Sequence, residues 1–278
     1  MAKTTRLAGQ AAIVSGGSKG IGLSTAAEVV RRGGSVGLIA RGRGALEQAA
    51  GRLRTLISDG TQFVDLIQAD ATDRNDVGPK LEAFIAARGV PDYLINAVGY
   101  ARPDYVSNFG LEDFQRQMEV NYYGQLIPTL VVLPHLVQAR RGHIAFVSSM
   151  LGYFGIIGYA AYAPSKFALV GLAEVLRHEL RPDGLRVSVL YPPDTDTPGF
   201  EVENTTKPPE THELSANVKV AQPDDVARQF VDGMLRGRFQ IFPSGAMMVW
   251  RLQRYAPQLV RAFLDRDLRK ARRRVGKT

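Results

Sequence analysis

The chain contains no cysteine and only four histidines, and both scarcities exclude kinds of chemistry. Without cysteine there are no disulfides and no thiolate nucleophiles, which is compatible with a reducing compartment. The histidines show no spacing typical of metal ligands, so we expect no metal site. They are His135, His143, His178 and His212.

Long apolar runs are also absent. The first residues, "MAKTTRLAGQ", have no apolar stretch of the kind found in a signal peptide. No run reaches the roughly 18 apolar residues that span a bilayer, and the longest candidate, "LIPTLVVLPHLV", is interrupted by Pro128, Pro134 and His135. We therefore predict a cytoplasmic location. The length of 278 residues, with 45% hydrophobic and 22% charged residues, is typical of one large globular domain.

A glycine-rich segment near the start of the chain predicts a site for a dinucleotide. In "AAIVSGGSKGIG" an apolar run leads into Gly16, Gly20 and Gly22, and a helical pattern follows. Gly16 permits a tight turn, while Gly20 and Gly22 let the backbone approach a pyrophosphate and let the helix contact the strand. The helix N-terminus supplies free N–H groups for the anion. An ordinary strand–helix turn can have the same glycine pattern, so the loop alone does not establish a dinucleotide site.

A second motif, "YAPSK", places Tyr162 and Lys166 four residues apart on one helix face. A nearby positive charge favours the phenolate and lowers the pKa of a tyrosine, which then exchanges a proton with a substrate oxygen. Ser149 ends the apolar run "HIAFVSS" and can hydrogen-bond the same oxygen. Such a pair also occurs by chance on solvated helices, so its meaning depends on the glycine loop.

The spacing G-x-x-x-G-x-G, together with Ser149, Tyr162 and Lys166, resembles the short-chain dehydrogenase/reductase family over roughly residues 8–245. The resemblance implies that Tyr162 protonates the substrate oxygen and that Ser149 orients the carbonyl. It also implies that Lys166 lowers the pKa of Tyr162 and binds the nicotinamide ribose. Asn121, in "EVNYYG", then kinks a helix and holds a water that returns the proton.

The same resemblance implies the residues that bind the cofactor. Asp70, with Ala71 beside it, stands where the family holds the adenine ring, and Asn96 and Gly99 form a turn in "INAVG". In the glycine loop the expected contacts are Gly16, Ser18, Lys19, Gly20, Ile21 and Gly22.

Apolar runs alternate with helical patterns along the chain, which predicts a parallel sheet covered on both faces. We expect a single α/β domain over residues 1–246, a doubly wound Rossmann-type fold with a seven-stranded parallel sheet, whose ligands bind at the carboxyl ends of the strands. Strands are predicted near 11–15, 35–40, 62–69, 92–96, 143–148, 186–191 and 239–242. Helices are predicted near 20–32, 44–58, 75–88, 111–139, 160–181 and 223–236.

The residues that end the second predicted strand favour NADPH over NADH. Arg41 and Arg43 stand there, and no Asp or Glu lies between Gly34 and Glu47. An acidic residue would accept from the ribose 2′-hydroxyl of NAD, whereas arginine suits the 2′-phosphate of NADP. Lys19 adds a second cation. The alternative is that both arginines are merely solvated.

A long Pro- and Thr-rich segment, "YPPDTDTPGFEVENTTKPPETHELS", follows the sixth strand and reads as a lid or binding loop. The family usually has Pro-Gly-x-x-x-Thr here, but this chain has Pro192 followed by Pro193. Thr197 keeps the spacing of the threonine that holds the nicotinamide carboxamide, and Thr195 is the second candidate. The segment resembles the 3-ketodihydrosphingosine reductases, the sphingolipid branch of the family. That resemblance implies NADPH-dependent reduction of a 3-keto group in a lipid with a long alkyl chain and a 2-amino group.

A lipid substrate needs an apolar channel beside Tyr162. The segment 150–163 offers one wall, although core packing or a subunit contact explains it equally well. Its apolar residues are Met150, Tyr153, Phe154, Ile156 and Ile157. Glu201 and Glu203 could meet a substrate ammonium, but a solvated loop is the favoured interpretation.

The last part of the chain, residues 247–278, carries ten Lys or Arg and two Asp, which equals the net charge of +8 of the whole chain. Apolar residues at helical spacing and a polybasic end predict an amphipathic helix that docks on an anionic membrane. We therefore expect a peripheral position on the inner face of the membrane. A packed helix with a solvated end is the alternative. Nucleic acid is not expected as a partner.

Two other functions remain open. The first is reduction of another lipophilic ketone, such as a steroid, a 3-ketoacyl thioester or a polyketide. The second is an NADP-binding scaffold or membrane adaptor without turnover, against which the complete set of Ser149, Asn121, Tyr162 and Lys166 argues. The family resemblance also implies a homo-oligomer, a dimer or tetramer formed through the two long helices near 111–139 and 160–181.

Overall fold

A computed structural model describes residues 7–216, 218–243 and 245–277 of the chain. In this part of the chain, seven strands form one parallel sheet in the order β3-β2-β1-β4-β5-β6-β7, which confirms the predicted doubly wound sheet. The strands are β1 Ala11–Ser15, β2 Ser35–Ala40, β3 Val64–Gln68, β4 Tyr93–Asn96, β5 His143–Val147, β6 Arg186–Leu190 and β7 Gln240–Ile241.

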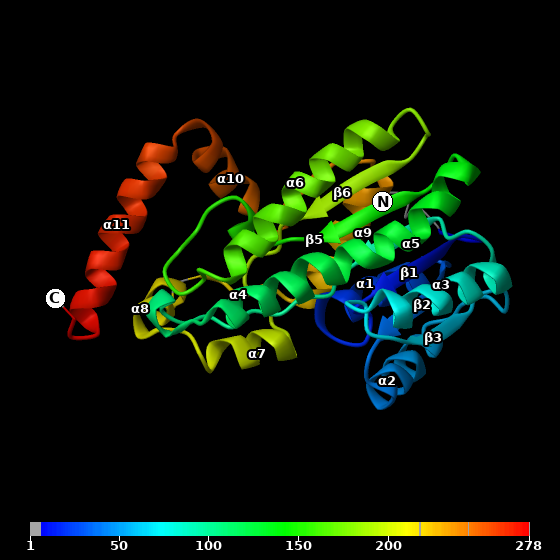
Figure 1. Cartoon of the computed structure of the whole chain (residues 1–278), viewed down its shortest axis with the longest axis horizontal. Helices are drawn as coiled ribbons and strands as arrows, with labels where there is room; N and C mark the ends of the chain where they lie inside the picture. The colour runs from blue at the N-terminus through cyan, green and yellow to red at the C-terminus, as the bar shows by residue number, and fades with distance from the viewer. Residues whose placement is uncertain (1–6, 217, 244, 278) are drawn as a thin grey trace.

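Helices cover both faces of the sheet, as Figure 1 shows. Because side chains alternate along a strand, Val14 of β1 enters one core and Ile13 the other. The Val14 core is closed by α1 (Gly20–Arg31), α2 (Arg43–Arg54) and α9 (Pro223–Leu235). The Ile13 core is closed by α3 (Arg74–Arg88), α5 (Gly124–Ala139) and α6 (Tyr162–Leu180).

The helix predicted over 111–139 is interrupted in the structure. It begins as α4 (Leu111–Met118), passes through a π-helical turn, η2 (Glu119–Tyr123), and continues as α5. A π turn holds one extra residue and is frequent at functional sites. Here it carries Asn121, whose side chain is fully buried.

The segment after β6, for which the sequence predicts a loop, is helical in two places. These are α7 (Pro198–Asn204) and α8 (Pro209–Ser215), both of which have proline in the first turn. Thr197 caps α7, because its hydroxyl accepts a hydrogen bond of 3.1 Å from the backbone N–H of Phe200. Each helix has only seven residues, too few to show a helical period in the sequence. The local signals for their starts are the pairs Thr197–Pro198 and Pro208–Pro209.

The tail forms two helices rather than one. They are α10 (Ala246–Tyr255) and α11 (Pro257–Arg274), and they meet at Pro257, which has no N–H to continue α10. The second helix contacts α8. In Figure 1, α7, α8 and α11 lie at the end of the molecule to which the arrows of β5 and β6 point. The tail therefore lies where the ligand of a doubly wound sheet is expected.

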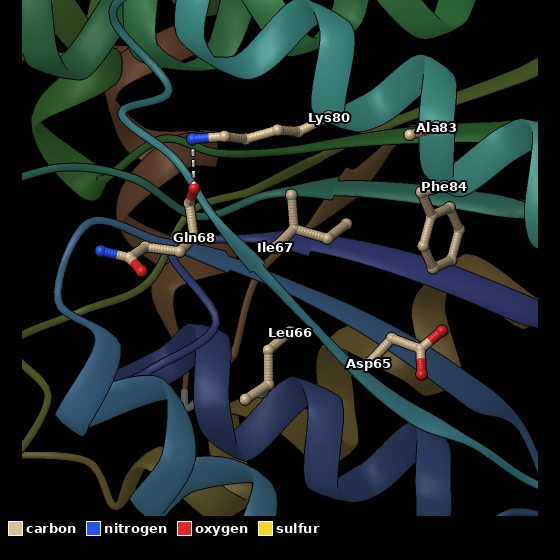
Figure 2. A pocket seen from close by; sticks show the side chains of 7 residues that line it. All are labelled: Asp65, Leu66, Ile67, Gln68, Lys80, Ala83 and Phe84. Carbon is tan, nitrogen blue, oxygen red and sulfur yellow. Dashed lines mark hydrogen bonds between the residues drawn. The ribbon is translucent and has the colours of Figure 1, made fainter.

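The edge strand β3, at the side of the sheet away from β7, borders a hollow of about 700 Å³. Figure 2 shows Lys80 reaching over it to donate a hydrogen bond of 2.6 Å to the carbonyl of Gln68. Asp65 on the same strand forms an ion pair with Arg88, 2.8 Å long. Charged side chains at an edge strand oppose the addition of a foreign strand. None of the predicted site residues lines this hollow.

Among the described residues, no helix combines the length and the apolar character that a bilayer-spanning segment requires.

Candidate active site

A cavity of about 1040 Å³ lies at the carboxyl ends of the strands, between the sheet and α7, α8 and α11. Most of the predicted site residues line it, which brings together segments from the whole length of the chain. They are Gly16, Ser18, Lys19, Gly20, Ile21, Gly22, Arg41, Asp70, Ala71, Gly99, Ser149, Tyr162, Lys166, Pro192, Thr195 and Thr197. Arg43, Asn96 and Asn121 do not line it.

The glycine loop leaves an open cradle at the N-terminus of α1. Gly16 has φ of +76°, and a Cβ there would stand 2.8 Å from the backbone nitrogen of Val98. A Cβ on Gly22 would stand 2.2 Å from the carbonyl oxygen of Gly16. Lys19, the N-cap, makes no capping hydrogen bond through its side chain. The first N–H groups of α1 therefore remain available to an anion, and the cradle fits the pyrophosphate of a nicotinamide dinucleotide.

The two arginines after β2 have different surroundings. Arg41 lines the cavity with its side chain 67% exposed, and its Nη1 lies 3.9 Å from Oδ2 of Asp70. Arg43 begins α2 and forms an ion pair of 2.8 Å with Glu47. Of the two arginines, only Arg41 thus faces the cavity, which Lys19 lines as well.

Asn96 and Asn121 support the site from behind. The side-chain amide of Asn96 donates a hydrogen bond of 3.0 Å to the hydroxyl of Thr129, which links β4 to α5. The side-chain oxygen of Asn121 accepts a hydrogen bond of 2.8 Å from the backbone N–H of Tyr100. Its side-chain NH2 group donates one of 3.0 Å to the hydroxyl of Ser165. Asn121 therefore joins the segment after β4 to α6.

Tyr162, Lys166 and Ser149 meet in the cavity wall. Tyr162 begins α6, and Nζ of Lys166 lies 5.6 Å from the centroid of the Tyr162 ring. The ammonium donates 3.0 Å to the carbonyl of Val147 at the end of β5. Ser149 lines the same cavity and acts on Tyr162 to lower the pKa of its phenol, and its hydroxyl accepts a hydrogen bond of 3.1 Å from the N–H of Leu151. The predicted three-residue set is thus assembled.

The pKa values of Tyr162 and Lys166 differ from the expectation that the lysine lowers the pKa of the tyrosine. Burial raises the pKa of the Tyr162 phenol, and the negative charge of Glu203 raises it further, against the effect of the Ser149 hydrogen bond. Burial also lowers the pKa of Lys166 to about 7. In the chain without ligands, Lys166 therefore does not bring the pKa of Tyr162 below its ordinary value. The spacing of the two residues shows the nearby cation but not the burial of both groups, which dominates their pKa values.

The apolar half of the cavity agrees only partly with the predicted wall. Met150, Phe154 and Ile156 line the cavity, but Tyr153 and Ile157 do not. The ring of Tyr153 contacts those of Tyr191 and Phe242 at centroid distances of 5.7 and 6.3 Å, so it belongs to the core. Further lining residues come from elements whose placement over the site the sequence did not reveal. They are Phe200, Leu214, Val218, Leu264 and Asp267.

Of the two acidic residues considered for a substrate ammonium, only Glu203 lies in the cavity wall. Glu203 lines the cavity and accepts a hydrogen bond of 2.5 Å from the phenol of Tyr159. Glu201 is exposed and does not line it.

Comparison with known proteins places the chain among reductases. A family model described as short chain dehydrogenase matches residues 10–208. A 3-dehydrosphinganine reductase of Danio rerio is 39% identical over 249 residues, which cover 88% of this chain and 75% of the relative. A 3-ketodihydrosphingosine reductase of Bos taurus is 38% identical, covering 85% and 72%. One of Dictyostelium discoideum is 36% identical, covering 85% and 75%.

Solved structures share the fold. Levodione reductase superposes with a TM-score of 0.79 at 20% identity, covering 86% of this chain and 98% of that protein. A 3-oxoacyl-[acyl-carrier protein] reductase from Brucella melitensis gives 0.72 at 23% identity, covering 87% and 93%. At these identities the likeness concerns the fold alone.

The cradle predicts opposite effects for two glycine-to-alanine substitutions. Gly22→Ala forces its Cβ against the Gly16 carbonyl, and we expect the free energy of unfolding to fall by about 1–3 kcal/mol. Gly51→Ala, inside α2 with open space around it, should raise the free energy of unfolding by about 0.5–1 kcal/mol. Urea unfolding measures both. Equal stability of the two variants would mean that Gly22 is not held against Gly16.

Proposed function

The chain belongs to the short-chain dehydrogenase family, and we propose that it reduces the 3-keto group of 3-ketodihydrosphingosine to the alcohol, with NADPH as the hydride donor. The relatives that bear this activity in their names align over most of the chain at 36–39% identity. The observation that carries the proposal is one cavity in which Ser149, Tyr162 and Lys166 adjoin an apolar wall. The named relatives favour this ketone over steroid or 3-ketoacyl substrates and over an adaptor without turnover.

The reduction divides between the cofactor and the chain. When bound, NADPH supplies a hydride to the carbonyl carbon. The electron pair of the carbonyl π bond moves to oxygen, and Tyr162 Oη gives that oxygen its proton. Ser149, which lines the cavity with Tyr162, orients the carbonyl. The raised pKa of Tyr162 keeps the phenol protonated before the step, as a proton donor requires.

Lys166 and Asn121 return the proton to Tyr162 in this proposal. A Cβ on Gly99 would stand 3.1 Å from both the Lys166 ammonium and the carbonyl oxygen of Asn121, so the two polar groups are neighbours. Asn121 has a second lone pair on that oxygen, which can hold a water. With a pKa of about 7, Lys166 can lose and regain a proton near neutral pH.

The cofactor contacts follow from the cavity lining. The cradle of Gly16, Gly20 and Gly22 would hold the pyrophosphate, and Arg41 and Lys19 would bind the 2′-phosphate that distinguishes NADPH from NADH. Asp70 and Ala71 line the cavity and would hold the adenine, while Pro192, Thr195 and Thr197 line it and would hold the nicotinamide. Gly99 lies beside Lys166, where the nicotinamide ribose is expected.

We also propose that the tail, residues 247–278, docks the reductase unit 1–246 on an anionic membrane at its cytoplasmic face. The helices α10 and α11 expose apolar side chains among their basic residues. These side chains are Met248, Leu252, Tyr255, Leu259 and Phe263. Leu264 of α11 lines the cavity itself, so a lipid leaving the membrane beside α11 would reach the apolar wall directly.

A homo-oligomer, a dimer or tetramer, is part of the proposal. The helices α4, α5 and α6 expose apolar side chains that a partner copy could cover. They are Leu111, Leu130, Phe167 and Val175, which are 43–71% exposed.

Tyr162→Phe tests the proton donor. We expect turnover of 3-ketodihydrosphingosine to fall by about 10²- to 10⁴-fold, because the proton has no other donor, while NADPH binding measured by fluorescence stays close to wild type. Tyr123→Phe, at a side chain 47% exposed and outside the cavity, is the control and should change neither. Near-normal turnover of Tyr162→Phe would remove this residue from the mechanism.

Arg41→Ala tests the choice of cofactor. Loss of a charge-assisted contact to the 2′-phosphate should raise KM for NADPH about tenfold, with little change in KM for NADH. Arg43→Ala is the matched control, since Arg43 is paired with Glu47 outside the cavity. The assignment is wrong if both variants keep the wild-type preference.

Co-sedimentation with vesicles tests the tail. The full chain should sediment with phosphatidylglycerol vesicles and much less with phosphatidylcholine, because anionic lipid contributes about 1 kcal/mol per basic residue near the surface. Replacing Tyr255, Leu259 and Phe263 by serine should weaken sedimentation. The same change at Val106 and Val202, both 65% exposed elsewhere, should not. Equal sedimentation of all three proteins would contradict the docking proposal.

A further inference from the structure

An acidic corner lies in the cavity next to the reacting phenol. It consists of Asp194, which follows β6, Glu203 of α7, and Lys207 behind them, with Tyr159 as a fourth member. Asp194, Glu203 and Tyr159 line the cavity. The rings of Tyr159 and Tyr162 have centroids 5.8 Å apart, so the corner adjoins the proposed proton donor.

Glu203 is fixed by two partners. Its Oε1 accepts 2.5 Å from the Tyr159 phenol and lies 3.4 Å from Nζ of Lys207, whose side chain is only 1% exposed. The ammonium of Lys207 also stands 4.3 Å from the centroid of the Phe200 ring. Within the described residues, this buried Nζ donates no hydrogen bond. Lys207 is thus paired with Glu203 by an ion pair of 3.4 Å inside the protein.

The charges of the corner do not balance. Two carboxylates face one ammonium, which leaves an excess of one negative charge when all three are ionised. Burial raises the pKa of both Asp194 and Glu203, and the charge of Lys207 only partly offsets this. In the described part of the chain, the carboxylate of Asp194 has no hydrogen bond or ion pair at contact distance. A cation from outside the chain would complete the set.

Both carboxylates act on the reacting phenol. Glu203 first, and Asp194 to a smaller extent, raise the pKa of Tyr162 beyond the effect of burial. The geometry agrees, because Tyr159, which donates to Glu203, has its ring centroid 5.8 Å from that of Tyr162.

We propose that Asp194 and Glu203 bind the 2-ammonium group of the substrate and so select 2-amino ketones over simple ketones. The inference rests on the proposed function. The carbon that carries the ammonium is bonded to the carbonyl carbon, so a carbonyl placed at Tyr162 brings the ammonium to the corner.

A consequence concerns the proton transfer itself. A bound ammonium offsets the negative charge that opposes ionisation of Tyr162, so the phenol gives up its proton more readily when the amino ketone is present. The amine should therefore increase kcat as well as lower KM.

The experiment compares two ketones in the full-length enzyme with NADPH. One is 3-ketodihydrosphingosine, and the other is the same ketone without the 2-amino group. The readout is the ratio of their kcat/KM values in the wild type, Asp194→Asn and Glu203→Gln. Glu201→Gln is the matched control, because Glu201 lies on the same helix but is exposed and outside the cavity.

We expect the ratio to fall about 10- to 100-fold in Asp194→Asn and Glu203→Gln, the range for loss of a hydrogen bond to a charged group, and to stay unchanged in Glu201→Gln. A merely structural corner would lower both activities and leave the ratio unchanged, which would overturn the inference. Asp194→Asn decides the matter if Glu203→Gln fails to fold with Lys207 unpaired. A wild type that reduces simple ketones but not 3-ketodihydrosphingosine would instead overturn the proposed function, and the inference with it.

Discussion

The site depends on one buried contact, the hydrogen bond between the ammonium of Lys166 and the carbonyl of Val147 at the end of β5, 3.0 Å long. It fixes the first turn of α6 against the carboxyl end of the sheet, and Tyr162 begins that turn. The price of burying the ammonium is a pKa of about 7. Because the parallel strands end at the same edge, this anchor also sets Tyr162 beside the cradle at α1 and the apolar wall.

Much of this arrangement could be predicted from the sequence, because the relevant signals are local. Glycine spacing predicted the turn in which Gly22 touches the Gly16 carbonyl, and the four-residue spacing predicted that Tyr162 and Lys166 share a face. Alternation of strands and helices predicted the parallel sheet. The Asn121 prediction also had a local basis, although the π turn around it changes the course of a helix that the pattern showed as continuous.

The remaining features are set by contacts between distant segments, which periodicity does not reveal. Arg41 and Arg43 look equivalent in sequence, but only Arg41 lines the cavity, since Glu47 pairs with Arg43. The pKa of Tyr162 reflects carboxylates that are brought near by α7 and by the turn after β6. Leu264 and Asp267 reach the cavity because α11 contacts α8, a pairing that the basic composition of the tail did not suggest.

A crystal structure with NADP⁺ and an unreactive analogue of 3-ketodihydrosphingosine tests the central claim most directly. We expect Oη of Tyr162 to lie about 2.6–3.2 Å from the oxygen that replaces the ketone. We also expect the alkyl chain to lie along Met150, Phe154 and Leu264. An analogue whose oxygen is bound elsewhere, with the Tyr162 hydroxyl turned away from the nicotinamide, would contradict the account.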